Sequence, residues 1–115
     1  MIRKLLASLA IAATLNASSA LAQSLPAPHA SAGAGQYGTV ITTAQPLTVP
    51  SAFAGFARIC VEGQAARWRD DGTAPTTAVG MPVPSGTCFD YAGPLAAFQI
   101  ISTTAGGTID VVYYR

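Results

Sequence analysis

Cys60 and Cys88 have the best-defined chemistry in this 115-residue chain, which contains no other cysteine. An even cysteine count favours a disulfide if the protein is exported to an oxidising compartment. On neighbouring strands, the bridge would close a loop of about 28 residues and contribute roughly 3 kcal/mol. Two packed thiols are the alternative. A catalytic thiol would need a base, and the only histidine, His29, precedes the domain predicted below.

The densest charged cluster of the chain is residues 67–72, Arg-Trp-Arg-Asp-Asp-Gly. Successive side chains of a strand point to opposite faces, so Asp70 and Asp71 do not form a paired general acid and base. Beside a glycine, these aspartates suit hydrogen bonds to the backbone amides of a turn. We therefore predict a structural hairpin in which Gly72 occupies a turn position with positive φ.

Trp68 lies inside this cluster and has two interpretations. The favoured one is a core tryptophan flanked by solvated Arg67 and Arg69. The other is a stacking platform for a sugar or a base. Because this second interpretation stays open, the candidate binding or interaction residues are Arg67, Trp68, Arg69, Asp70, Asp71, Tyr113 and Tyr114.

The rest of the sequence carries no pattern typical of catalysis or of cofactor binding. It lacks a His/Cys cluster with metal-ligand spacing, a phosphate-binding glycine loop and a histidine placed for a serine triad. A hydrolase would need two carboxylates about 5–9 Å apart in a cleft. Exposed strand acids such as Asp90 and Asp110 are more often solubilising. We predict no catalytic residue, no metal site and no cofactor.

The N-terminal residues have the three-part layout of a secretory signal peptide. Arg3 and Lys4 precede an apolar run over residues 5–15, and residues 20–22, Ala-Leu-Ala, form an A-x-A cleavage site. The apolar run is too short to span a bilayer. We therefore predict a signal peptide over residues 1–22 and a secreted or periplasmic protein without stable membrane insertion. An uncleaved membrane-associated helix is the alternative.

Removal of this segment changes the charge balance of the protein. The 93 remaining residues contain four arginines, five acidic residues and no lysine, which is a net charge of −1. Such a chain lacks the basic surface that nucleic acids and anionic membranes attract, so we predict no nucleic-acid partner. Its length suits one small domain.

The mature chain divides into a linker and this domain. Residues 23–36 are rich in Pro, Ala and Gly and bury too little apolar surface to order, which predicts a flexible linker. Residues 37–115 are rich in Val, Ile, Thr and aromatic residues, interrupted by Gly or Pro at intervals typical of short strands. They predict an all-β fold, a small antiparallel β-sandwich or jelly-roll-like domain.

Seven strands are expected, and residues 73–84, with three prolines, are expected to form an extended surface loop. The strands cover residues 38–43, 47–49, 56–62, 65–69, 87–91, 96–102 and 108–114. In the third and in the last of these strands, alternation places a set of apolar residues on one face of the strand. These sets are Ala57, Ile59 and Val61, and Ile109, Val111 and Tyr113.

Three blocks in one order resemble a group of small β-rich proteins from tailed-phage and prophage structural gene clusters. The blocks are residues 67–76 (RWRDDGTAPT), 79–82 (VGMP) and 111–115 (VVYYR), and the resemblance covers about residues 50–115. It implies a virion-associated or assembly protein that forms homo-oligomers through strand edges or sandwich faces. It brings no catalytic residues.

The signal peptide and the cysteine pair depart from that group, because virion parts assemble in the cytoplasm. A domesticated prophage domain exported by its bacterial host reconciles both features. A translation start further downstream would instead make the protein virion-associated. We therefore expect a non-enzymatic structural or interaction module that associates with itself or with another structural protein. The alternative is a secreted or periplasmic binding module for a glycan or a protein, using Trp68, Tyr91, Tyr113 and Tyr114.

Overall fold

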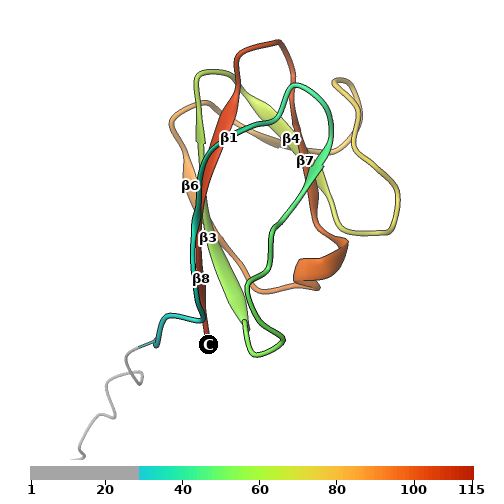
Figure 1. The fold of residues 1–115 in the computed structure, drawn as a ribbon. Coiled ribbons are helices and arrows are strands. Elements are labelled where there is room, and N and C mark those ends of the chain that lie inside the picture. The colour runs from blue at the N-terminus through green and yellow to red at the C-terminus, as the bar shows by residue number, and fades with distance from the viewer. Residues whose placement is uncertain (1–28) are drawn as a thin grey trace, which may run out of the picture.

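Two antiparallel sheets of four strands each pack face to face in the computed structural model, which describes residues 29–115 (Figure 1). One sheet has the strand order β1-β8-β3-β6 and the other has the order β2-β7-β4-β5. The predicted all-β sandwich is therefore confirmed. The strands are β1 (Gln36–Val40), β2 (Gln45–Pro46), β3 (Phe56–Glu62), β4 (Ala66–Arg69), β5 (Met81–Val83), β6 (Cys88–Tyr91), β7 (Gln99–Ser102) and β8 (Thr108–Tyr114).

The predicted signal peptide, residues 1–22, lies outside the described residues, as do residues 23–28. Within residues 29–115, no helix has the length and hydrophobicity needed to cross a membrane.

Strands β3 and β8 are the central pair of the first sheet and agree with their predicted bounds. They pair along seven residues, from Phe56 opposite Tyr114 to Glu62 opposite Thr108. Burying each of their inward aliphatic side chains contributes about 1.5–3 kcal/mol, so this pair anchors the core. Their inward side chains are the two predicted sets, and all six are fully buried: Ala57, Ile59, Val61, Ile109, Val111 and Tyr113.

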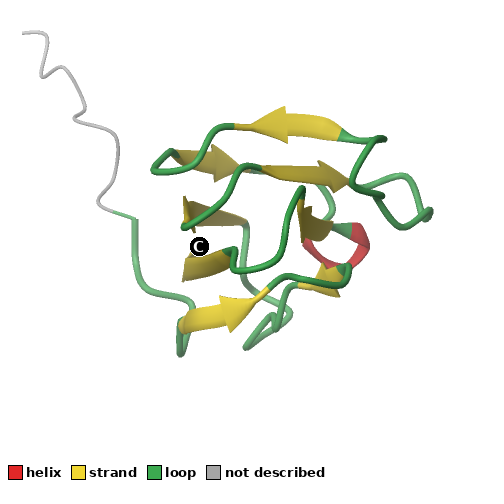
Figure 2. Ribbon diagram, turned by 90° about the horizontal axis from the view of Figure 1, so that it is seen from above, coloured by secondary structure: helices red, strands yellow, loops and turns green. Residues whose placement is uncertain are grey.

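An aromatic cluster joins the two sheets on the side of β4 and β6. The ring of Phe98 lies 5.2 Å from that of Trp68 in β4 and 4.7 Å from that of Tyr91 in β6, measured between centroids. Phe98 follows a short 3-10 helix, η1 (Leu95–Ala97), which is red in Figure 2. The strand predicted over residues 96–102 therefore begins later, with β7 at Gln99. Aromatic pairs at these distances stabilise a core beyond their buried area.

The loop predicted over residues 73–84 contains a strand, so that prediction is wrong at its C-terminal end. In β5, Pro82 lies opposite Arg67 and Met81 lies opposite Trp68. β5 is the last strand of its sheet, and an edge strand needs backbone N–H groups on only one side. Proline is tolerated there for this reason, and its presence made the segment look like a loop.

The chain changes sheets between β1 and β2, and both strands differ from the predicted ranges 38–43 and 47–49. β1 ends at Val40, and the fully buried Ile41 bridges the sheets through its backbone. The N–H of Ile41 donates to the carbonyl of Gly107, and its carbonyl accepts the N–H of Ser102 at 2.7 Å. The apolar pattern continues through this crossing, so it does not mark where the strand ends.

Residues 29–36, assigned to the predicted flexible linker, lie along β8. Ser31 forms a bridge with Tyr114, and the N–H of Ala32 donates to the carbonyl of Tyr113 at 2.9 Å. Ala32 is itself part of the core. The domain therefore begins before Tyr37, the predicted boundary. Backbone hydrogen bonds hold this segment against β8. Such bonds do not depend on side-chain type, so the composition of the segment could not predict them.

Candidate functional site

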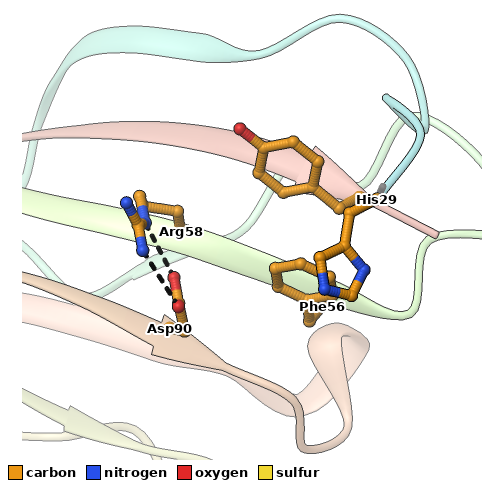
Figure 3. A pocket seen from close by; sticks show the side chains of 5 residues that line it. His29, Phe56, Arg58 and Asp90 are labelled. Atoms are coloured by element: carbon orange, nitrogen blue, oxygen red, sulfur yellow. Dashed lines mark hydrogen bonds and ion pairs between the residues drawn. The ribbon is translucent and has the colours of Figure 1, made fainter. Parts of the chain in front are cut away.

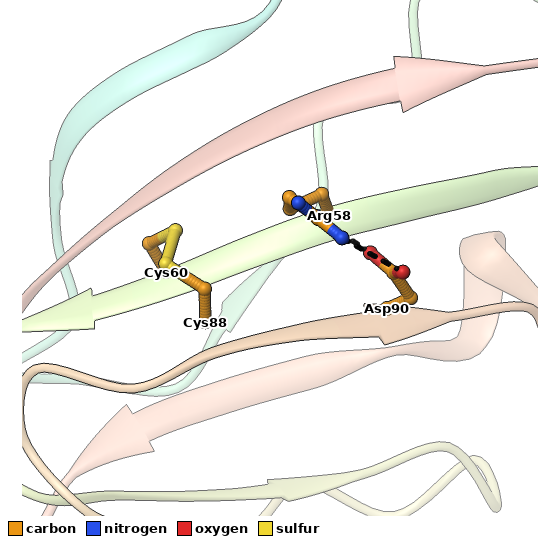
Figure 4. The surroundings of a disulfide bond; sticks show 4 residues. All are labelled: Arg58, Cys60, Cys88 and Asp90. Carbon is orange, nitrogen blue, oxygen red and sulfur yellow. Dashed lines mark hydrogen bonds and ion pairs between the residues drawn. A yellow bond between two sulfur atoms is a disulfide. The ribbon is translucent and has the colours of Figure 1, made fainter. Parts of the chain in front are cut away.

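The disulfide lies on the outer face of the first sheet, where Cys60 of β3 is directly opposite Cys88 of β6 (Figure 4). Their Cα atoms are 4.0 Å apart. This confirms the predicted bridge and excludes the packed-thiol and catalytic-thiol interpretations in this oxidised state. Stable disulfides are typical of oxidising environments such as the periplasm or the extracellular space.

An ion pair stands next to the disulfide on the same face. Arg58 of β3 donates from Nε to Oδ1 of Asp90 at 2.8 Å and from Nη2 to Oδ2 at 3.1 Å. These hydrogen bonds hold the pKa of Asp90 below its usual value and raise the pKa of Arg58. Both side chains are more than half exposed, so water screens the pair and the two groups remain open to further contacts.

An aromatic group adjoins the ion pair. Phe56 and Tyr114 are direct cross-strand partners whose rings stack with centroids 5.0 Å apart. The ring of His29 meets Phe56 edge-on, at 4.6 Å. Together with Arg58 and Asp90, these residues line an open hollow of about 460 Å³ (Figure 3). We call it the β3 hollow.

Of the residues that line the β3 hollow, only Tyr114 is among the binding candidates that the sequence predicts. The alternation of β3 places Phe56 and Arg58 on the outer face, which is a usable signal. The pairing of β3 with β6 and β8 brings Asp90 and Tyr114 beside them, and this register is not visible in the sequence. His29 lies in the segment predicted to be a flexible linker, so the sequence gives no signal that it reaches this hollow.

The candidate cluster over residues 67–72 forms a second open hollow. Trp68 packs against the core, and Arg69 forms a two-point ion pair with Asp71. Oδ1 of Asp71 also accepts the N–H of Thr73 at 3.2 Å, as expected for a turn. Gly72 has a φ of 82°, which confirms its predicted conformation. The hollow measures about 380 Å³ and is lined by Trp68, Arg69, Asp70, Asp71, Gly80 and Met81.

Asp70 and Arg67 have structural partners that the sequence did not predict. Oδ2 of Asp70 accepts the hydroxyl hydrogen of Tyr91 at 2.7 Å, so the expected bond to a turn amide is replaced by a bond to the other sheet. Arg67, predicted to be solvated, is only partly exposed. Its Nη1 donates to the carbonyl of Gly80 at 3.0 Å, and its buried Nε has no hydrogen-bond partner within the described residues.

Tyr113 and Tyr114 are both binding candidates predicted from the sequence, but their side chains point to opposite faces of β8. Tyr113 is fully buried, and its hydroxyl donates to Oε1 of Gln36 at 2.5 Å. Burial raises the pKa of Tyr113 to about 12. A surface ligand can therefore reach Tyr114 but not Tyr113. The structure brings Trp68, Arg69, Asp70 and Asp71 together in one hollow and places Tyr114 in the other, whereas Arg67 lines neither.

Among residues 29–115, no group of three or more His, Cys, Asp or Glu side chains is arranged to hold a metal ion. No family model, curated protein or solved structure matches the chain.

Proposed function

We propose that the protein is a non-enzymatic structural module that acts by associating with further copies of itself. The observation that carries this proposal is the position of its exposed apolar side chains. Tyr37 and Val40 are 69% and 59% exposed on β1, and Met81 is 57% exposed on β5. Val79, just before β5, is 51% exposed. Apolar groups on sheet edges favour contacts between proteins.

These two groups lie on edges of different sheets, because β1 ends one sheet and β5 ends the other. The two edges also present different side chains, Tyr37 and Val40 on β1 and Val79 and Met81 at β5, so they are not equivalent surfaces. A contact that joins β1 of one copy to β5 of the next is heterologous, and repeating it builds a ring or a filament. Such an assembly agrees with the expected kinship to phage and prophage structural proteins, which the three sequence blocks support.

The charged side chains support a structural role as well. Arg58 pairs with Asp90, and Arg69 pairs with Asp71. Oδ1 of Asp110 accepts the N–H of Gly38 at 2.7 Å and holds the irregular part of β1. With Asp70 and Arg67 engaged as described above, most ionisable groups of the described domain stabilise strands and turns. This use of charge favours a scaffold over an enzyme.

Export and prophage origin are part of the same proposal. The disulfide and the N-terminal pattern support export, and the sequence blocks support a domesticated phage domain. The gene neighbourhood tests the origin, since capsid and tail genes beside this gene would support it. Isolated placement among unrelated host genes would count against it. N-terminal sequencing of the protein recovered from the periplasm or the medium tests cleavage after Ala22.

Light scattering coupled to size-exclusion chromatography tests the association. We expect concentration-dependent oligomers for the purified protein and monomers for Tyr37→Asp and Met81→Asp. An equimolar mixture of these two variants should form dimers, because each retains one intact half of the heterologous contact. Phe53→Asp is the control, since Phe53 is 77% exposed but lies outside β1 and β5. A strictly monomeric wild-type protein would overturn the proposal.

Ligand binding is a second candidate function, favoured by the β3 hollow. The alternative drawn from the sequence used Trp68, Tyr91, Tyr113 and Tyr114 for a glycan or protein ligand. Tyr91 and Tyr113 are buried, and Trp68 is packed against the core. Tyr114 lines the β3 hollow beside the more than half exposed Arg58 and Asp90. Binding is therefore better placed at the β3 hollow than at the tryptophan.

A further inference from the structure

We infer that the β3 hollow binds a neutral pyranose ring of a glycan. This inference rests on the second candidate function and is independent of association through β1 and β5. The hollow combines an aromatic group with a compact set of donors and acceptors, within the size range of about 300–1,000 Å³ typical of small-molecule sites. A pyranose has the matching surfaces, an apolar C–H face and a rim of hydroxyl groups.

The ion pair supplies the polar half of the site. A guanidinium has five N–H donors, and Arg58 uses one at Nε and one at Nη2 for Asp90, so further donors remain. Each carboxylate oxygen of Asp90 has unused acceptor capacity. Neighbouring sugar hydroxyls both donate and accept, and one hydroxyl can meet the arginine while the next meets the aspartate.

The same pair selects against charged ligands. Asp90 repels an anion that approaches Arg58, and Arg58 repels a cation that approaches Asp90. Either ion would also have to compete with an existing two-point ion pair. A neutral polyol meets neither penalty, because it uses only donors and acceptors that the pair leaves free.

The aromatic half of the site is held in place before any ligand arrives. Phe56 and Tyr114 stack on each other across β3 and β8, and His29 braces Phe56 from the side. His29 is itself positioned by the segment that pairs with the end of β8 through Ser31. Rigid aromatic side chains lose little conformational entropy on binding, and both Phe56 and Tyr114 are partly exposed.

Amide and side-chain NMR spectra of the full-length protein, titrated with cellohexaose and maltohexaose, test the inference. We expect one or both oligosaccharides to shift the Arg58 Nε–H signal and the ring signals of Tyr114 and Phe56. The indole N–H of Trp68 should not shift. Oligogalacturonate and oligoglucosamine, which carry negative and positive charge, should bind more weakly than the neutral oligosaccharides.

Two variants and two matched controls locate the site. Tyr114→Ser should weaken binding about tenfold, which is the loss expected for one stacking contact. Arg58→Met should do the same through the polar half and leaves the aromatic stack in place. Tyr37→Ser removes an exposed tyrosine elsewhere, and Arg69→Met breaks the other exposed ion pair, so neither should change the affinity.

The inference would be overturned by no shift with either neutral oligosaccharide, by a preference for a charged one, or by shifts centred on Trp68. Equal affinity of wild type and both hollow variants would also overturn it. Light scattering on the same samples separates the two proposals. Tyr114→Ser should retain the oligomeric state of wild type, and Tyr37→Asp should lose it while still binding the oligosaccharide.

Discussion

The hydroxyl of Tyr91 donates to Oδ2 of Asp70 at 2.7 Å and connects β6 of one sheet to the residue that follows β4 of the other. Burial is the main cause that raises the pKa of Tyr91, and the hydrogen bond to Asp70 adds to it. An aspartate in a turn of charged residues is thus used to join two layers. The Pro94 carbonyl, 3.4 Å away, is the other acceptor near this hydroxyl.

Asp70→Ala should lower the free energy of unfolding by about 1–3 kcal/mol, because it removes the main acceptor of a buried hydroxyl. Asp71→Ala is the matched control. Asp71 carries the same charge one residue away but pairs with Arg69 at the surface, so its removal should cost clearly less. Urea unfolding at pH 7 measures both. Equal losses for the two variants would show that the Tyr91 contact contributes nothing of its own.

Removing the disulfide should destabilise the domain by about 3–4 kcal/mol, the value expected for a closed loop of 28 residues. For a domain of this size, the melting temperature should fall by more than about 10 °C. Calorimetry with and without a phosphine reductant, and on Cys60→Ser/Cys88→Ser, provides the measurement. The reductant should not change the melting temperature of the double variant. An unchanged melting temperature for reduced wild type would contradict the prediction.

Gly72→Val should destabilise the protein by more than about 1 kcal/mol, because a β-branched residue strains at a φ of 82°. A Cβ at this position would meet no atom within 4 Å, so the cost is conformational and not steric. Gly72→Asn should therefore recover most of the loss, since asparagine tolerates this region. Gly55→Ala is a control at ordinary φ with room for a Cβ. Thermal unfolding of the three variants measures these differences, and equal losses for Gly72→Val and Gly72→Asn would contradict the prediction.

Stability should fall as the pH rises from about 10 towards 12. Unfolded tyrosine ionises near pH 10. Burial raises the pKa of Tyr113 to about 12 in the folded protein, so folding favours its neutral form. That contribution is complete below pH 10 and is lost as the pH approaches the folded value. Burial also raises the pKa of Tyr91, so this residue adds to the loss of stability in the same direction.

Urea unfolding between pH 8 and 12, with tyrosinate absorbance recorded in parallel, tests this dependence. Tyr113→Phe should be about 1 kcal/mol less stable than wild type at neutral pH, because the bond to Gln36 is lost. Its stability should then decline less steeply above pH 10. Parallel stability curves for wild type and Tyr113→Phe would contradict the assignment. Short incubations, followed by return to neutral pH, control for alkaline damage to the disulfide.

Local features of the sequence determined that the domain is built of strands, which side chains of β3 and β8 share a face, and where the Asp71-Gly72 turn lies. Alternation over residues 56–62 and 108–114 places every second side chain inside, because the geometry of a strand has a period of two. The Asp71-Gly72 pair specified its turn, since only a few residue types accept positive φ without strain. The presence of only two cysteines indicated the Cys60–Cys88 disulfide, because two thiols in an oxidising compartment can pair only with each other.

Only the tertiary structure decided which distant side chains meet. Asp70 reaches Tyr91, 21 residues away, and Tyr113 reaches Gln36, 77 residues away. The β3 hollow depends on the register of β3 with β6 and β8 and on a bridge from Ser31 that composition does not reveal. Alternation is a property of one strand, whereas register is set by the packing of all strands around a common core. The sequence therefore determined which side chains face outwards, and the fold determined which of them stand together.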